Sequence, residues 1–299
     1  MLLLIALLVM AVPAQAQRVR LTARVAGEDR PLSTAQLRRD LKGVPRLPEQ
    51  RLHWREAQAG LSWTELDLRA GALRHPLRAI VVRIDPRQFD WQLDLVTRSN
   101  GMTGAWNVDS VPDDVVLAFN AGQFKETGPW GWLVMQSYER RDPGYGPISV
   151  GIALDSAGAL RWLLPRQLPA ARKDSSVRFA FQSYPLLLFN GIVPAVLLAS
   201  NDVDRDHRDA RLVLAQRADG TVLVVLTRYE ALGGVVQRVP IGLTVPESVV
   251  LLAALGARNA VMLDGGISAQ LRIRSATETY QWRGLRDVPL ALVLRRKAR

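Results

Sequence analysis

From Leu77 onward the chain consists of short apolar segments, rich in branched side chains and separated by turn signals. Such segments are too short for independent helices, and their composition favours β-strands that pair with one another. The dipeptide Asn190-Gly191 and the run 218–220 (Ala-Asp-Gly) lie between segments and predict tight turns. The expected strands lie at 79–85, 91–96, 115–119, 148–154, 160–164, 179–189, 212–215, 222–226, 259–263, 269–274 and 288–294.

One segment predicts a helix instead. Thr244 and Glu247 have the spacing of a capping box, and Pro246 falls in the first turn, where its missing N–H is tolerated. Residues 248–255 are apolar on nearly all sides, and Gly256 follows as a helix-ending residue. Because strands outnumber helices, we expect an α+β fold with a mixed, mostly antiparallel β-sheet and a buried helix around 245–256.

The amino terminus has the pattern of an export signal. Residues 1–12 are apolar and uncharged, and Ala14-Gln15-Ala16 is a small-residue cleavage site. This pattern is typical of a signal peptide over residues 1–16, although a buried strand and an uncleaved anchor are the alternatives. The run is shorter than the roughly 20 residues of a membrane-spanning helix. We therefore expect a periplasmic or secreted protein that is not an integral membrane protein.

The mature chain divides by composition. Residues 17–75 are polar, rich in arginine and interrupted by prolines, so we expect an N-terminal arm with one helix between Thr34 and Leu41. Residues 76–299 carry the regular apolar pattern and form the expected main domain.

Composition excludes several classes of protein. The 299 residues include no cysteine, which excludes disulfide scaffolds, thiolate metal sites and cysteine nucleophiles. The formal net charge is +11, but the basic residues are scattered and do not form the stripe typical of a nucleic-acid binder. We therefore expect no nucleic-acid partner; an anionic envelope or sugar-phosphate polymer is an equally physical partner for a cationic surface. Walker A, G-x-S-x-G, H-E-x-x-H and G-x-G-x-x-G motifs are absent from the sequence.

Three polar clusters follow or precede expected strands. Asp264 comes directly after an apolar strand and is followed by Gly265 and Gly266, which allow a ligand or another backbone to approach closely. Asn120 ends a second strand, and Gly122 would permit a turn with positive φ. The third cluster, 204–211, leads into a strand at Arg211. Each cluster also has a structural explanation without function: a tight turn at Asp264, an Asx turn at Asn120 and a solvated charged loop at 204–211.

Metal and cofactor sites have little support in the sequence. The three histidines, His53, His75 and His207, are dispersed, which argues against zinc when cysteine is absent. We expect no cofactor, while an all-oxygen site for a divalent cation stays open.

Taken in order, these motifs resemble the phosphodiester glycosidase family, the domain of the lysosomal uncovering enzyme and of many exported bacterial proteins. The most specific stretch is 242–268, which contains GLTVPE, a helix ending in LGA, and NAVMLDGGIS. The family typically reads G-L-T-x-x-E, L-G-A and N-A-x-x-L-D-G-G-x-S. Further matches are 120–124 (NAGQF), 183–187 (SYPLL) and Arg211 ahead of Asp219-Gly220. The sequence departs from the family pattern at Leu212, Ala215, Ile267 and Thr227-Arg228.

The resemblance implies an exported hydrolase that cleaves a sugar from a phosphodiester in envelope or extracellular glycans. It implies Asp264 as nucleophile or base, Arg211 as a phosphate clamp and Asn120 as an orienting group. Asp206 and Asp209 are candidates for a second carboxylate, whereas Glu247 is also explained by its place in the capping box. The further residues expected to bind substrate are Gly122, Gly265, Gly266, Ser268, His207, Asp209 and Tyr184.

Two other functions stay open at this stage. One is an exported protein that binds anionic glycan without turning it over. The other is a hydrolase of a different bond, such as a peptidoglycan amidase.

Overall fold

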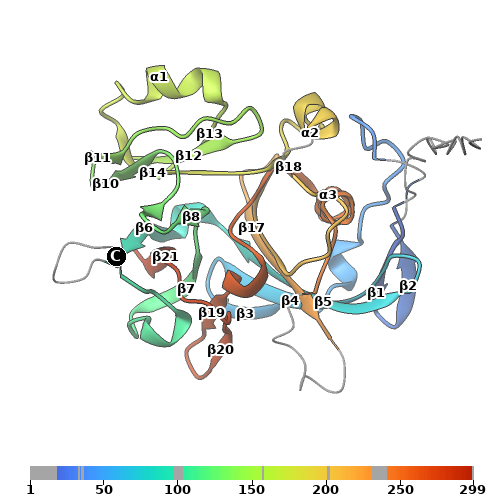
Figure 1. Cartoon of the computed structure of the whole chain (residues 1–299). Helices are drawn as coiled ribbons and strands as arrows, with labels where there is room; N and C mark the ends of the chain where they lie inside the picture. The colour runs from blue at the N-terminus through green and yellow to red at the C-terminus, as the bar shows by residue number, and fades with distance from the viewer. Residues whose placement is uncertain are drawn as a thin grey trace, which may run out of the picture.

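The computed structural model describes residues 19–32, 34, 37–96, 104–156, 158–200, 203–230 and 241–297. The signal peptide expected at residues 1–16 lies outside these ranges. A nine-stranded sheet runs through the molecule (Figure 1) in the order β15-β18-β16-β17-β5-β4-β1-β2, and β3 also pairs with β4. Its strands are β1 (Leu21–Val25), β2 (Glu28–Pro31), β3 (Arg55–Gln58), β4 (Leu61–Ala70), β5 (His75–Ile84), β15 (Leu186–Leu188), β16 (Arg211–Arg217), β17 (Val222–Tyr229) and β18 (Ala257–Met262).

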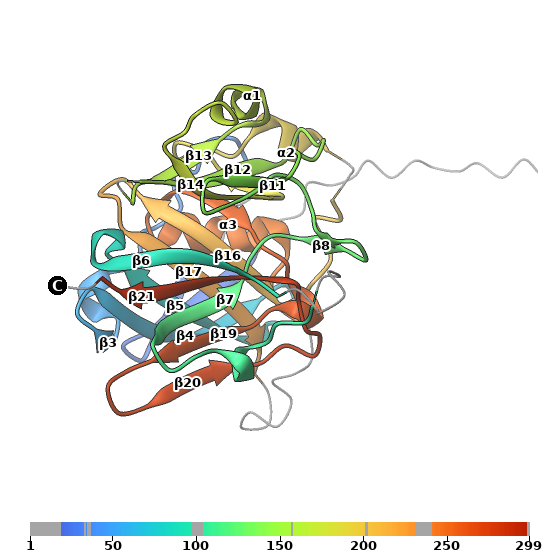
Figure 2. The same cartoon turned by 90° about the vertical axis from the view of Figure 1, so that its left-hand side faces the viewer.

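Two five-stranded sheets lie against the main sheet (Figure 2). The first has the order β11-β10-β14-β12-β13, and the second has the order β20-β19-β7-β21-β6. Their strands are β6 (Phe89–Leu95), β7 (Val115–Asn120), β10 (Leu133–Met135), β11 (Tyr138–Arg141), β12 (Val150–Asp155), β13 (Leu160–Leu163), β14 (Val177–Ser183), β19 (Leu271–Arg274), β20 (Thr279–Trp282) and β21 (Leu290–Arg296); β8 (Phe124–Lys125) and β9 (Gly128–Pro129) form a short separate pair.

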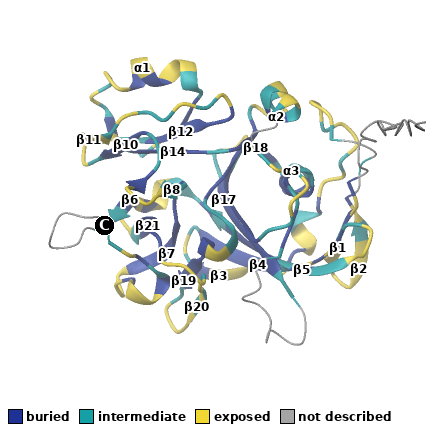
Figure 3. Cartoon of the chain, in the orientation of Figure 1, coloured by how far each residue is buried: buried dark blue, intermediate teal, exposed yellow. Residues whose placement is uncertain are grey.

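The described helices are short. Helix α3 (Val245–Ala254) is buried over most of its length, whereas α1 (Leu168–Ala171) and α2 (Ala195–Ala199) are partly exposed, as Figure 3 shows. The remaining turns of helix are 3₁₀: η1 (Glu49–Arg51), η2 (Pro86–Gln88), η3 (Val108–Ser110), η4 (Pro165–Gln167) and η6 (Gly266–Ser268). No helix in the described ranges is long and apolar enough to cross a membrane.

The central strands of the main sheet are apolar on both faces. On β5, Ile80 and Val82 pack into a core shared with the two five-stranded sheets, while Ala79 and Val81 pack into a core shared with α3. Successive side chains of a strand point to opposite faces, so a strand covered on both sides reads as a continuous apolar run. This three-layer arrangement explains the runs of branched side chains in the sequence.

The expectation of a mixed sheet is wrong, because every strand pair in the described ranges is antiparallel. The mixed sheet was expected from the order of the elements, which are mostly strands with one central helix. Helix α3 does connect β17 with β18, but β18 pairs with β16, which runs in the opposite direction. The crossover therefore skips one strand, and no parallel pair results. The mostly antiparallel character and the buried helix at 245–254 are confirmed.

The region before residue 75 contributes more structure than its composition indicates. Strand β4 pairs with β5 along its whole length, from Leu61 opposite Ile84 to Ala70 opposite His75. The helix expected between Thr34 and Leu41 is not formed at the described residues 34 and 37–41. Thr34 instead forms a bridge with Val19, and the Arg39 carbonyl accepts a hydrogen bond from Val193. Tertiary pairing thus competes successfully with the weak local helix preference.

The predicted capping box is present, and its contribution can be measured. The Thr244 hydroxyl accepts a hydrogen bond from the Glu247 N–H at 3.3 Å, and the Glu247 carboxylate accepts one from the Thr244 N–H at 3.0 Å. We expect Thr244→Ala to lower the free energy of unfolding by about 1 kcal/mol, because an N–H of the first helical turn loses its acceptor. Urea denaturation of this variant beside Thr279→Ala, a change on an exposed strand, provides the comparison. Equal losses in the two variants would contradict a capping role.

Candidate active site

Antiparallel pairing brings the end of β18 next to the start of β16. Val213 lies opposite Met262, the Leu263 N–H donates to the Leu212 carbonyl at 2.8 Å, and the pairing continues beyond the strand ends. The Gly266 N–H donates to the Ala210 carbonyl at 2.7 Å. The Asp264 segment and the Asp209–Arg211 segment are therefore neighbours, although more than fifty positions separate them in the sequence.

The two glycines after Asp264 allow this close contact. A Cβ atom at Gly265 would lie 2.7 Å from the Ala210 carbonyl oxygen, and one at Gly266 would lie 2.8 Å from the Asp209 Oδ2. Gly266 also has a φ of +60°, which side chains disfavour. The close approach expected at these glycines is thus made by residues 209–210 of the same chain. Asp264 is the residue of this loop that carries an ionisable side chain.

Asn120 holds the Asp264 loop in place. Its Nδ2 donates to the Asp264 carbonyl at 2.7 Å, and its Oδ1 accepts from the Gln270 N–H at 2.9 Å. The side chain is almost fully buried, and the Asp264 N–H donates to the carbonyl of Ala121 at 3.3 Å. The amide therefore connects the end of β7 with the two segments that flank η6.

The expected positive φ at Gly122 is not found, and this prediction is wrong. The residue is required for a different reason: a Cβ atom there would collide with the backbone carbonyl oxygen of Gln182. The glycine lets β14 lie directly against the segment that follows Asn120.

Asp264 carries an unusual carboxyl group. The residue is half-buried, and its Oδ2 atom is buried without a hydrogen-bond partner among the described residues. Burial raises the pKa of Asp264 to about 6, and the nearby Asp209 carboxylate also raises it; a hydrogen bond from Ser268 and the charge of Arg286 oppose this shift. A buried acceptor without a partner is costly, and such groups are found where a protein uses them.

Asp209 is the second carboxyl group of the site. It lies against Gly266, and burial raises its pKa while the charge of Arg211 lowers it. Its charge also raises the pKa of Asp264, so the two carboxyl groups influence each other. The other candidate, Asp206, is exposed, and its N–H donates to the Asp204 carboxylate at 3.2 Å.

Arg211 is buried, and its guanidinium binds groups inside the protein. The Nε donates to the Leu243 carbonyl at 2.8 Å, Nη2 donates to the His207 carbonyl at 2.6 Å, and Nη1 lies 3.6 Å from the Met262 sulfur. Burial lowers the pKa of Arg211, and Asp209 opposes that effect. His207 contributes its carbonyl to this network and is itself exposed.

Glu247 has a second partner besides the capping box. The buried carboxylate forms an ion pair with Arg208 through two hydrogen bonds, at 2.6 and 2.8 Å. Arg208 also donates to the Gly242 carbonyl at 3.3 Å. The pair ties the 204–211 segment to the start of α3, which is a structural role for Glu247.

Tyr184 completes the site on the side of β14. Its ring packs edge-on against Trp130, with 4.8 Å between ring centroids. Burial raises the pKa of Tyr184, and the Asp264 charge raises it further. Gln123 fixes the Tyr184 backbone: its Nε2 donates to the Tyr184 carbonyl, and its Oε1 accepts from the Tyr184 N–H at 3.1 Å. An aromatic pair therefore stands beside the carboxyl group.

Sequence reasoning missed three residues of this arrangement. Gln123 lies inside the recognised 120–124 motif, but nothing in the sequence indicates that its amide would bind the Tyr184 backbone. Gln270 and Arg286 lie outside all the motifs, and only the packing of the loops brings them to Asp264.

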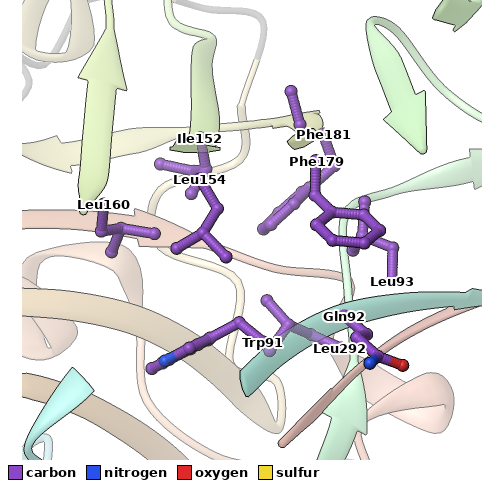
Figure 4. A pocket seen from close by; sticks show the side chains of 10 residues that line it. Trp91, Gln92, Leu93, Ile152, Leu154, Leu160, Phe179, Phe181 and Leu292 are labelled. Atoms are coloured by element: carbon purple, nitrogen blue, oxygen red, sulfur yellow. The ribbon is translucent and has the colours of Figure 1, made fainter. Parts of the chain in front are cut away.

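The described residues contain no group of three or more histidine or acidic side chains arranged to hold a metal ion. An apolar crevice lies elsewhere, between β6 and β21 on one side and β12 to β14 on the other (Figure 4). Trp91, Leu154 and Phe179 are among its lining residues. Its lining contains no ionisable side chain.

The raised pKa of Asp264 predicts how stability changes with pH. The folded protein binds the carboxyl proton more tightly than the unfolded chain, whose carboxyl pKa is near 3.8, so stability falls as the pH rises from about 4 to about 6. At about 1.4 kcal/mol per pKa unit, this loss is about 3 kcal/mol. Asp264→Asn has no carboxyl group to ionise and so does not lose this stability. Relative to the wild type, the variant is therefore more stable at pH 8 than it is at pH 4. Urea denaturation at both pH values measures the gain, with exposed Asp40→Asn as control. Parallel behaviour of the two variants would contradict a raised pKa.

Comparisons with known proteins agree with the residue motifs. The model of the phosphodiester glycosidase family matches residues 113–295, which is more than half of the chain. The fold is similar to the zebrafish N-acetylglucosamine-1-phosphodiester alpha-N-acetylglucosaminidase catalytic domain, auto-inhibited by its pro-peptide, with a TM-score of 0.63 and 14% identity over 81% of this chain and 86% of that one.

A hypothetical protein from Synechocystis is also similar, with a TM-score of 0.51 and 15% identity over 82% of this chain and 64% of that one. No curated protein matches the chain. The two structural likenesses show a shared fold, and the family match extends over β7 to β21. The chain therefore belongs to the phosphodiester glycosidase family.

Proposed function

We propose that this protein is an exported glycosidase that hydrolyses the bond between the anomeric carbon of a sugar and a phosphodiester in envelope or extracellular glycans. Family membership supports the class of reaction. The observation that carries the proposal is the Asp264 carboxyl group, whose buried Oδ2 has no hydrogen-bond partner in the described part of the chain. Export rests on the apolar run and cleavage site of residues 1–16.

The chemistry makes modest demands on the protein. The C–O bond at the anomeric carbon breaks, its electron pair leaves with the phosphate oxygen, and a hydroxyl from water completes the free sugar. A phosphate monoester is a weakly basic leaving group, so protonation of the leaving oxygen matters less than for an alkyl glycoside. The main requirement is to stabilise the positive charge that develops on the sugar ring.

Asp264 and Asp209 supply the carboxyl groups for this task. With a pKa of about 6, Asp264 is mostly ionised at neutral pH, as a nucleophile or base must be. In this role the Asp264 carboxylate attacks the anomeric carbon or takes a proton from the attacking water. Asp209 provides a second carboxyl group, on the other side of Gly266.

The surrounding residues position this pair. Asn120 acts through its hydrogen bond to the Asp264 carbonyl, and Ser268 acts through its hydrogen bond to the Asp264 carboxylate. Arg211 holds the 207 and 243 carbonyls in place, and its charge acts on the second carboxyl group, Asp209. The pair of Tyr184 and Trp130 offers an aromatic surface of the kind on which sugar rings pack.

The test is release of sugar from a sugar-1-phosphodiester by purified protein. We expect Asp264→Asn to lower kcat/KM by about a thousandfold, since such a carboxyl group typically contributes 10²–10⁴-fold. Asp40→Asn, an exposed change with the same loss of charge, serves as the control. Thermal unfolding and circular dichroism establish that both variants are folded. Wild-type activity in Asp264→Asn, or saturable glycan binding without any turnover by the wild type, would contradict the proposal.

The pH dependence of the rate reports the role of Asp264. If the ionised form is the active one, kcat/KM is low in acid and rises as the pH increases through about 6. Initial rates between pH 4.5 and pH 8 measure this limb. A rate that falls as the pH rises through this range would show that the protonated form is active, and would reassign Asp264 as the general acid.

A further inference from the structure

Binding of the phosphate group requires a cation whose N–H groups are accessible, and Arg211 does not meet this requirement well. Each of its three nitrogens already has a neighbour within the protein, namely the Leu243 carbonyl, the His207 carbonyl and the Met262 sulfur. Its side chain is also buried. A phosphate would have to compete with carbonyl groups that the folded structure holds in position.

Arg286 differs from Arg211 in both respects. The residue is exposed, and no carboxylate or carbonyl in the described part of the chain accepts a hydrogen bond from its guanidinium. The guanidinium carbon lies 4.8 Å from the centre of the Phe124 ring. A guanidinium on an aromatic face is held in place without using its N–H donors, so these stay available for an anion.

The backbone of Arg286 is fixed in the same frame as Asp264. Its N–H donates to the Ile267 carbonyl at 3.0 Å, and its carbonyl accepts from the Gln270 side chain at 3.3 Å. Gln270 in turn donates its N–H to Asn120, which binds the Asp264 carbonyl. The charge of Arg286 acts on the carboxyl group of Asp264, where it lowers the pKa.

Other arginines on this side of the molecule are engaged elsewhere. Arg283 pairs with Asp109, and Arg208 pairs with Glu247. Arg272 donates to the Val111 carbonyl at 2.6 Å. Arg286 is thus the arginine next to Asp264 that combines exposure, a fixed backbone and an uncommitted guanidinium within the described residues.

The geometry points to Arg286 as the residue that binds the phosphate group of the substrate. This inference rests on the proposed function and deepens it, because it orients the substrate. The sugar ring lies toward Tyr184 and Trp130, the scissile bond lies at Asp264, and the phosphate lies toward Phe124 and Arg286. Two N–H groups of one guanidinium match two phosphate oxygens, and their attraction grows as the leaving phosphate gains negative charge.

The experiment compares Arg286→Ala, Arg286→Lys and Arg258→Ala with the wild type. Arg258 is exposed near the start of β18, so its loss controls for the change in net charge. Two quantities are measured: KM for a sugar-1-phosphodiester, and Kd for inorganic phosphate by calorimetry. Since a hydrogen bond to a charged group contributes about 1.5–3 kcal/mol, Arg286→Ala should raise both constants at least about tenfold. The KM and Kd of Arg286→Lys should lie between those of the wild type and those of Arg286→Ala, because lysine keeps the charge but loses the paired donors.

Each outcome decides the question. A tenfold weaker affinity for phosphate in Arg286→Ala, with a wild-type affinity in Arg258→Ala, supports the assignment. This holds even if the wild type releases no sugar; in that case the proposed function fails and the anion site stands. Wild-type values of KM and Kd in Arg286→Ala overturn the assignment and return phosphate binding to Arg211. A wild-type protein that does not bind phosphate also overturns it.

Discussion

The antiparallel pairing of β16 with β18 places the start of one strand beside the end of the other. A hydrogen-bonded ladder fixes the relative position of two strands to a fraction of a residue spacing, and here the ladder continues past the strand ends to Gly266 and Ala210. Asp209 and Asp264 thereby become neighbours on a rigid base. A parallel arrangement would have put the two carboxyl groups at opposite ends of the sheet.

A rigid base has a particular value for a buried carboxyl group. Water would stabilise the Asp264 carboxylate, and its burial at this junction costs free energy that the surrounding core must offset. The main sheet is covered on both faces, by α3 on one side and by the two smaller sheets on the other. That packing holds the loop in place while the Asp264 Oδ2 has no hydrogen-bond partner within the described ranges.

The arginines illustrate how little a count of charges says about binding. Most of the 39 basic residues are arginine, and many of those described are bound to carboxylates or to backbone carbonyls of the protein itself. Arg211 stands at the position that the family motif indicates, yet it acts within the protein. Arg286 belongs to no motif, but it is exposed beside Asp264 on the ring of Phe124.

Much of the fold was accessible from the sequence because its signals are local. The capping box at Thr244, the buried helix and the apolar strands depend on neighbouring residues, and each is present in the structure. The helix expected between Thr34 and Leu41 and the mixed sheet failed, because both depended on pairing partners that lie far away in the sequence.

Local sequence patterns were enough to identify the side chains at the strand ends, the glycines beside Asp264 and the family to which the chain belongs. Which of these side chains meet, and which donors remain uncommitted among the described residues, depends on the three-dimensional packing. Contacts such as those of Gln270 with Asn120 and of Arg286 with Phe124 join loops that are distant in the chain. Their geometry arises from the packing of three sheets, and local sequence patterns do not encode it.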